Sequence, residues 1–104
     1  MGDMIFSSLT ARKTALVLDQ KDNVGVALAD LAAGEACTVI DDNGREFELV
    51  VTENIPFGHK FALHDFGKDE GVIKYGEEIG RMKDSLPKGG WIHNHNMYCD
   101  RGMK

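Results

Sequence analysis

Short β-like runs separated by glycine are the feature that most restricts how this chain can fold. Runs of four to six residues, rich in β-branched side chains, occupy residues 14–18, 23–28, 36–40 and 46–51. Such runs, bounded by glycine and polar residues, predict strands. Residues 27–34 and 77–86 suit only one or two helical turns each, the first ended by Gly34 as a helix C-cap. The pattern therefore predicts a mainly β fold.

Turn residues indicate how these strands connect. Asn43-Gly44 lies between two predicted strands and is a strong hairpin signal, in which we expect a positive φ at both positions. Residues 60–66 and 71–75 flank a further turn. Nothing repeats at a fixed period, so we expect one domain over residues 14–98, with flexible ends at 1–13 and 99–104.

Composition excludes several classes of function. The 104 residues carry a formal charge of −5, which disfavours binding to a nucleic-acid backbone. No apolar run reaches the roughly 20 residues of a membrane helix, and the first residues lack the apolar region of a secretory signal, so we expect a cytoplasmic protein. Cys37 and Cys99 have no metal-site spacing, and we expect both to be reduced thiols.

The segment "WIHNHN" near the end of the chain carries the first candidate site. If it is extended, His93 and His95 project to one side and Asn94 and Asn96 to the other. Two converging imidazoles can bind one divalent metal or an anionic substrate. An edge strand with merely solvated polar side chains is an equally good interpretation of the spacing alone.

A second candidate lies in "IPFGHKFAL". Pro56 and Gly58 suit a tight turn that places His59 and Lys60 at the start of the next strand. An imidazole beside an ammonium suits a carboxylate partner. The alternative, favoured by these residues alone, is that Lys60 extends over the core edge while His59 caps the turn.

Four sequence blocks, taken in order, resemble a known family. They are "KDNVGVALADLAAG", "IPFGHKFAL", "VIKYGEEIG" and "HNHN", and they extend over most of residues 15–96. They resemble the SAF-type small domain of the altronate and galactarate dehydratases, a family of UxaA-type hydro-lyases with a relative in the small subunit of sulfolactate sulfo-lyase. The resemblance implies a small SAF domain of the β-clip type, either fused to a larger catalytic domain or working as a separate small subunit.

The same resemblance implies roles for individual residues. His59 and Lys60 are the implied catalytic residues, and the implied substrate-binding residues are His59, Lys60, His93, His95 and Asn96. His93 and His95 are the implied metal ligands, shared with a partner subunit. Relatives of this kind begin the terminal block with another histidine, where this chain has Trp91, and commonly have a small or apolar residue in place of Asn94. A site with three histidines from this block is therefore disfavoured.

Chemistry favours a subunit over a complete enzyme. Elimination of water from a sugar acid needs a base, stabilisation of an enediolate and a proton for the departing hydroxyl. A metal usually performs the second task. We expect Fe or Mn in an assembled enzyme with a large catalytic subunit and an aldonate or aldarate substrate, and no tightly bound metal on this chain alone. The chain can also form a homo-oligomer. Two alternatives stay open: a non-catalytic sugar-acid-binding or assembly module, and a small subunit of a sulfolactate sulfo-lyase.

Overall fold

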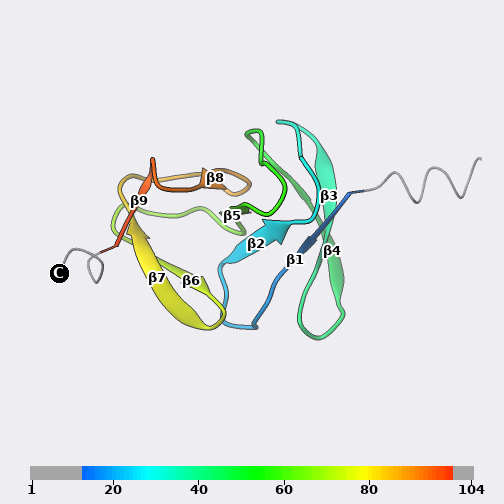
Figure 1. Ribbon diagram of the computed structural model, residues 1–104, viewed down its shortest axis with the longest axis horizontal. Helices are drawn as coiled ribbons and strands as arrows, with labels where there is room; N and C mark the ends of the chain where they lie inside the picture. The colour runs from blue at the N-terminus through cyan, green and yellow to red at the C-terminus, as the bar shows by residue number, and fades with distance from the viewer. Residues whose placement is uncertain (1–12, 100–104) are drawn as a thin grey trace, which may run out of the picture.

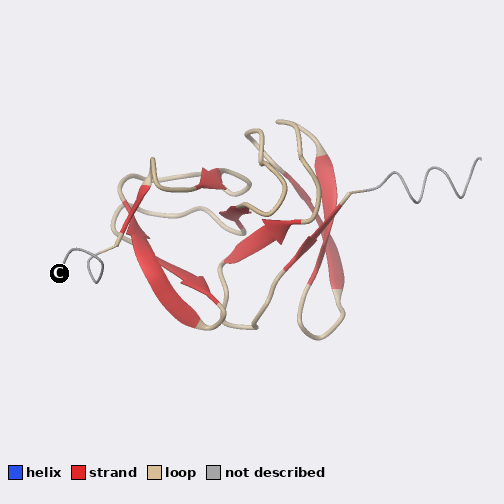
Figure 2. Ribbon diagram, viewed as in Figure 1, coloured by secondary structure: helices blue, strands red, loops and turns tan. Residues whose placement is uncertain are grey.

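The computed structural model describes residues 13–99, and every regular element in that range is a strand (Figure 2). The mainly β fold expected from the sequence is confirmed. The expected flexible ends lie almost wholly outside the described residues. The strands are β1 (Thr14–Leu16), β2 (Val24–Ala27), β3 (Ala36–Ile40), β4 (Glu46–Val50), β5 (Lys60–Ala62), β6 (Gly71–Lys74), β7 (Glu77–Met82), β8 (Trp91–Ile92) and β9 (Met97–Tyr98).

The strands form two sheets. One has the order β4-β3-β1-β2-β5-β8, in which β1 and β3 run parallel and the other neighbours antiparallel. The other has the order β6-β7-β9 and is antiparallel throughout. In Figure 1 the three-stranded sheet lies at the left and β1, β3 and β4 at the right, with β2, β5 and β8 between them. The short strands β5 and β8 thus lie near the middle of the molecule.

Two hydrophobic clusters fill the interior. The larger lies under the six-stranded sheet and contains Phe61, which is fully buried. Leu63 and Trp91 pack against its edge. The smaller cluster joins the two sheets, because it contains residues of β2, β5 and β8, residues of β6 and β7, and one residue of the loop after β5: Val24, Ala62, Phe66, Val72, Met82 and Ile92. In β5 and β8, Phe61 and Trp91 therefore pack with the larger cluster, whereas Ala62 and Ile92 pack with the cluster between the sheets.

Four loops repeat one local conformation, which the sequence did not predict. Leu31 forms an isolated bridge with Ile55, and Phe66 forms one with Leu86. Three residues after each bridge residue the backbone φ is positive, at Gly34, Gly58, Asp69 and Gly89. The spacing of these loops along the chain is unequal, so the repeat has no fixed period.

Side chains reinforce the loop pairs. The Asp30 carboxylate accepts a hydrogen bond from the Phe57 amide at 2.8 Å, and the Asn54 amide oxygen accepts one from the Ala33 amide at 2.9 Å. Asp65 accepts a bond from the Lys88 amide at 2.8 Å in the second pair. Side-chain acceptors for backbone amides thus join the loops of each pair.

The expected helical turns are wrong. Residues 77–82 form β7, and residues 27–34 leave β2 to form one of the repeated loops. The amides in the second segment bond to a different part of the chain: Leu31 donates to the Ile55 carbonyl at 2.9 Å and Gly34 to the Val51 carbonyl at 2.8 Å. Tertiary pairing has therefore overridden weak local helix propensity.

The predicted hairpin at Asn43-Gly44 is confirmed, because β3 and β4 pair antiparallel around it. Its turn type differs from the expectation, since among these residues only Gly44 has a positive φ, of 83°. Asp41 accepts bonds from the Asn43 and Arg45 amides, both at 2.9 Å, and so stabilises the loop of residues 41–45 that joins β3 to β4. The turn with two positive φ values is at Tyr75 and Gly76, which join β6 to β7.

Candidate functional site

The turn before β5 places the first pair of predicted site residues. Gly58 has a φ of 83°, and the His59 amide donates to the Pro56 carbonyl at 3.0 Å, which closes the turn. Lys60 then begins β5, paired with Val26 of β2 on one side and Ile92 of β8 on the other. Both side chains are half-buried.

The terminal histidine block is not extended, which corrects the expectation from the sequence. Strand β8 ends at Ile92, and residues 94–96 form a turn. Asn96 causes the turn: its side-chain oxygen accepts from the His93 amide at 2.9 Å, and its side-chain nitrogen donates to the Trp91 carbonyl at 2.7 Å. The alternation of faces predicted for His93 and His95 therefore does not apply. The contacts of Asn96 serve this turn and do not test its predicted role in substrate binding.

Trp91 nevertheless brings the histidines together. Its ring stacks on that of His93 with centroids 5.6 Å apart and planes 7° apart, and the His95 ring lies tilted at 4.9 Å. On the β5 side, the His59 ring lies 5.6 Å from Trp91 and 4.7 Å from His93. We call His59, Lys60, His93 and His95 the cationic cluster. It combines both candidate segments of the sequence, and its rings surround the indole of Trp91.

The electrostatics of the cluster are those of like charges placed close together. Loss of hydration lowers the pKa of His93, and the charges of His59, Lys60 and His95 lower this pKa further. Burial lowers the pKa of Lys60, and Lys74 on β6 adds to the effect. Lys74 thus extends the positive region onto the second sheet. A positive region of this kind on a chain of charge −5 favours an anionic ligand.

One carboxylate lies beside the cluster. Glu53 accepts a hydrogen bond from the backbone amide of Trp91 at 3.2 Å. Within residues 13–99, no group of three or more His, Cys, Asp or Glu side chains is arranged to hold a metal ion. The donors of the described residues therefore do not form a complete metal site.

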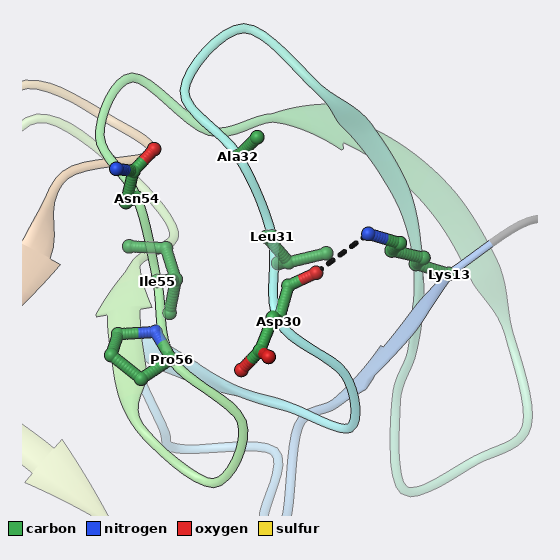
Figure 3. A pocket seen from close by; sticks show the side chains of 7 residues that line it. All are labelled: Lys13, Asp30, Leu31, Ala32, Asn54, Ile55 and Pro56. Carbon is green, nitrogen blue, oxygen red and sulfur yellow. Dashed lines mark hydrogen bonds between the residues drawn. The ribbon is translucent and has the colours of Figure 1, made fainter.

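One cleft of the described residues lies away from the histidines of the cationic cluster. It holds about 400 Å³ and is lined by Lys13, Asp30, Leu31, Ala32, Asn54, Ile55 and Pro56 (Figure 3). Its polar groups already have partners in the protein: the Lys13 ammonium donates to the Asp30 carbonyl at 2.7 Å and contacts Glu35 at 3.3 Å. The second pair of repeated loops forms a similar cleft at Asp65, Phe66, Ser85, Leu86 and Pro87. We therefore attribute both clefts to the loop architecture and place the candidate site at the cationic cluster.

Sequence reasoning missed Glu53 and one contact of Trp91. The residue that replaces a family histidine, Trp91, packs against the larger core. Its indole bond to His59 was not foreseen, because 32 positions separate them. Glu53 comes from the loop before Ile55, and no local pattern connects it to the histidines. Lys74 of β6 lies between apolar residues, a pattern that favours a solvent-exposed side chain over a place in a cationic site.

Comparisons with known proteins show the family of the chain. Residues 13–100 match the model of the altronate/galactarate dehydratase SAF domain. The chain belongs to this family. It is thus a small subunit, or a domain, of an enzyme of the lyase and dehydratase class. Among the residues that the structure describes, no helix is long and apolar enough to cross a membrane.

Its relatives within the family are of two kinds. The chain is 39% identical over 88 residues to the (2R)-sulfolactate sulfo-lyase subunit alpha of Chromohalobacter salexigens, a match that covers 83% of this chain and 94% of that protein. The corresponding subunit of Paracoccus pantotrophus is 43% identical over 65 residues, which are 62% of this chain and 96% of that protein. Altronate dehydratase of Escherichia coli is 44% identical over 75 residues, 72% of this chain but 14% of the enzyme.

Proposed function

We propose that this chain is the small subunit, or small domain, of a metal-dependent lyase that eliminates water from a sugar acid, an aldonate or aldarate such as altronate. The cationic cluster would form one wall of an active site whose other groups belong to a larger catalytic subunit. The observation that carries the proposal is the convergence of three imidazoles and a half-buried ammonium on an otherwise acidic chain.

The chemistry explains why such a wall is useful. A base removes the proton from the carbon that bears a hydroxyl and adjoins the carboxylate. The electron pair forms a double bond to the next carbon, whose hydroxyl leaves with a proton as water. The resulting enol then becomes a keto acid. Negative charge accumulates on the carboxylate and enolate oxygens, where preorganised cations and hydrogen-bond donors lower the barrier.

The residues of the cluster suit separate parts of this task. The Lys60 ammonium provides a point charge for the substrate carboxylate, and its partial burial strengthens the attraction. His59, together with Lys60, would stabilise the charge that develops during the reaction. His93 and His95 would contact substrate hydroxyls or lend an imidazole to the partner's metal, and we retain Asn96 as a substrate contact through the free capacity of its amide.

The proposed metal is Fe or Mn, held mainly by the large subunit. When bound, it would supply the Lewis acidity that polarises substrate oxygens. A pair of imidazoles leaves the remaining positions of a divalent ion to water, which makes a weak site. We therefore expect no tight metal binding by this chain alone.

A sulfolactate substrate is the second candidate, and the similarity to two sulfolactate sulfo-lyase alpha subunits favours it. Sulfolactate is also a hydroxy acid whose proton lies beside a carboxylate. Sulfite, leaving with its electron pair from the next carbon, takes the place of hydroxide. The cationic cluster suits this substrate for the same reason, because sulfolactate also develops negative charge on its carboxylate side during elimination.

Reconstitution with the candidate large subunit tests the proposal. The chain would be mixed with that subunit and assayed on altronate, galactarate and sulfolactate, with and without added Fe or Mn. We expect turnover of one substrate class by the mixture and none by either chain alone. Elimination by the purified small chain alone would contradict the proposal.

The same experiment separates an enzyme subunit from a binding module. His95→Ala should lower the activity of the complex, whereas His64→Ala is the matched control, because His64 lies outside the cluster and pairs with Glu70 at 2.7 Å. Full activity of both variants, or an active large subunit that does not need this chain, would favour a non-catalytic sugar-acid-binding or assembly module.

A further inference from the structure

The indole of Trp91 makes a hydrogen bond that determines the protonation pattern of His59. Its Nε1–H donates to Nδ1 of His59 at 3.2 Å. An indole nitrogen is only a donor, so the accepting Nδ1 must carry a lone pair. A neutral imidazole with a lone pair on Nδ1 holds its proton on Nε2. His59 therefore presents an N–H group on the side of its ring away from the indole nitrogen.

We propose that Trp91 fixes His59 as the Nε2–H tautomer and so makes it a hydrogen-bond donor to an oxygen of the bound hydroxy acid. This role rests on the proposed function. Binding of a metal at Nε2 would need the lone pair on that atom and the proton on Nδ1, where the indole already donates. Service as a base at Nδ1 would break the bond to Trp91. The bond thus selects one of the several roles that an imidazole can have.

Trp91 is well placed to act as such a positioning residue. Its amide bonds to Glu53, its carbonyl accepts from Asn96 at 2.7 Å, and it pairs with Phe61 across β5 and β8. Its ring packs against the larger core. Because several contacts hold Trp91, its indole keeps one orientation and fixes the ring of His59. His59 then loses little orientational freedom when it meets a substrate, which is the condition for effective preorganisation.

Nitrogen NMR of the intact chain tests the tautomer directly. Two-bond proton–nitrogen correlations, recorded near pH ~8 where an ordinary histidine is neutral, distinguish the tautomers. We expect the Nε2–H form to predominate at His59. Trp91→Phe, which retains an aromatic ring but lacks the N–H, should give a mixture of both forms at His59. A predominant Nδ1–H form in the wild type, or an unchanged pattern in Trp91→Phe, would overturn the proposal.

The reconstituted complex tests the donor role. His59→Ala should reduce kcat/KM by about 100-fold, the usual cost of losing one such donor. His59→Gln, whose amide nitrogen can take the place of Nε2–H, should recover activity to within about 10-fold of the wild type, because it restores that donor. If the kcat/KM of His59→Gln is as low as that of His59→Ala, the donor role of His59 is wrong.

The NMR and kinetic experiments together distinguish a failure of this inference from a failure of the proposed function. An active complex that needs His59 but shows the Nδ1–H tautomer contradicts only the inference. If the Nε2–H tautomer is observed but no complex with the large subunit eliminates any of the acids, the proposed function fails, and with it the donor role, while the assignment of the tautomer stands.

Discussion

Lys60 illustrates how a side chain with a proposed role in a site can work against folding. It keeps an ammonium half-buried and close to Lys74, and both effects lower its pKa. A lowered lysine pKa means that the folded state disfavours the charge, so stability is reduced at neutral pH and recovers only as the pH approaches the unfolded value of 10.5. We expect Lys60→Met to raise the melting temperature at pH ~7, because a neutral chain of similar length removes this cost.

The exposed Lys68 provides a matched control for that variant. Lys68→Met removes the same charge without removing a buried one, and it should leave the melting temperature within about 1 °C of the wild type, as is usual for surface substitutions. A clear fall in melting temperature for Lys60→Met would show that the ammonium stabilises the fold instead.

His93 should make the stability of the chain depend on pH. Its pKa is lower in the folded state than the ordinary value of 6.5, so below that value the unfolded chain binds more protons. The contribution of neutral His93 to the stability of the fold is therefore complete above pH 6.5, and it is lost as the pH falls through the pKa of the folded state. As the pH is lowered from neutral to acid, the melting temperature should fall more steeply for the wild type than for His93→Gln. Parallel curves for the two proteins would contradict the lowered pKa.

At the scale of elements, the repeated loop that contains Gly89 positions Trp91 at the start of β8. Gly89 has a φ of +89°, and a Cβ built on it would lie 2.5 Å from the Val50 carbonyl oxygen. We expect Gly89→Ala to destabilise the chain by about 1–3 kcal/mol, since it adds a steric clash to the strain of a positive φ. It should also displace Trp91, two positions further on, and weaken its bond to His59.

Gly34→Ala is the control for this prediction. Gly34 occupies the equivalent position of another repeated loop, with a φ of +87°, but a Cβ there would meet nothing within 4 Å. Denaturant unfolding of both variants should show a smaller loss for Gly34→Ala, which has only the strain. Equal losses would mean that the close approach at Gly89 contributes nothing.

The same loops show where sequence reasoning succeeds and where it stops. Runs rich in β-branched residues are local signals, and they identified β1 to β4 within a few residues. Strand β7 was mistaken for helix because Glu77, Glu78 and Met82 have good helix propensity, while its pairing with β6 and β9 is a tertiary effect. The turn at His93 depends on the Asn96 amide bonding to Trp91, a pattern that an extended interpretation of alternate residues cannot detect.

At the scale of the whole molecule, folding joins segments that are distant in the sequence. The pairing of β5 with β8 brings His59 and Lys60 to the terminal histidines. The sequence identified these residues from their type and from resemblance, but the indole at their centre and the contribution of Lys74 depend on the packing of two sheets. The gathering of three imidazoles and one half-buried ammonium on an otherwise acidic chain is the feature that supports the proposed wall of a shared active site.

The most direct test is kcat/KM for elimination by the complex of this chain with its large subunit, compared between wild type, Lys60→Met and Lys68→Met. Loss of the half-buried ammonium should reduce kcat/KM by about 100-fold, as loss of a preorganised charge in an active site does, while Lys68→Met retains wild-type activity. The folded state of each variant would be checked by its melting temperature. Wild-type activity of a folded Lys60→Met complex would contradict the assignment of the cationic cluster to the active site.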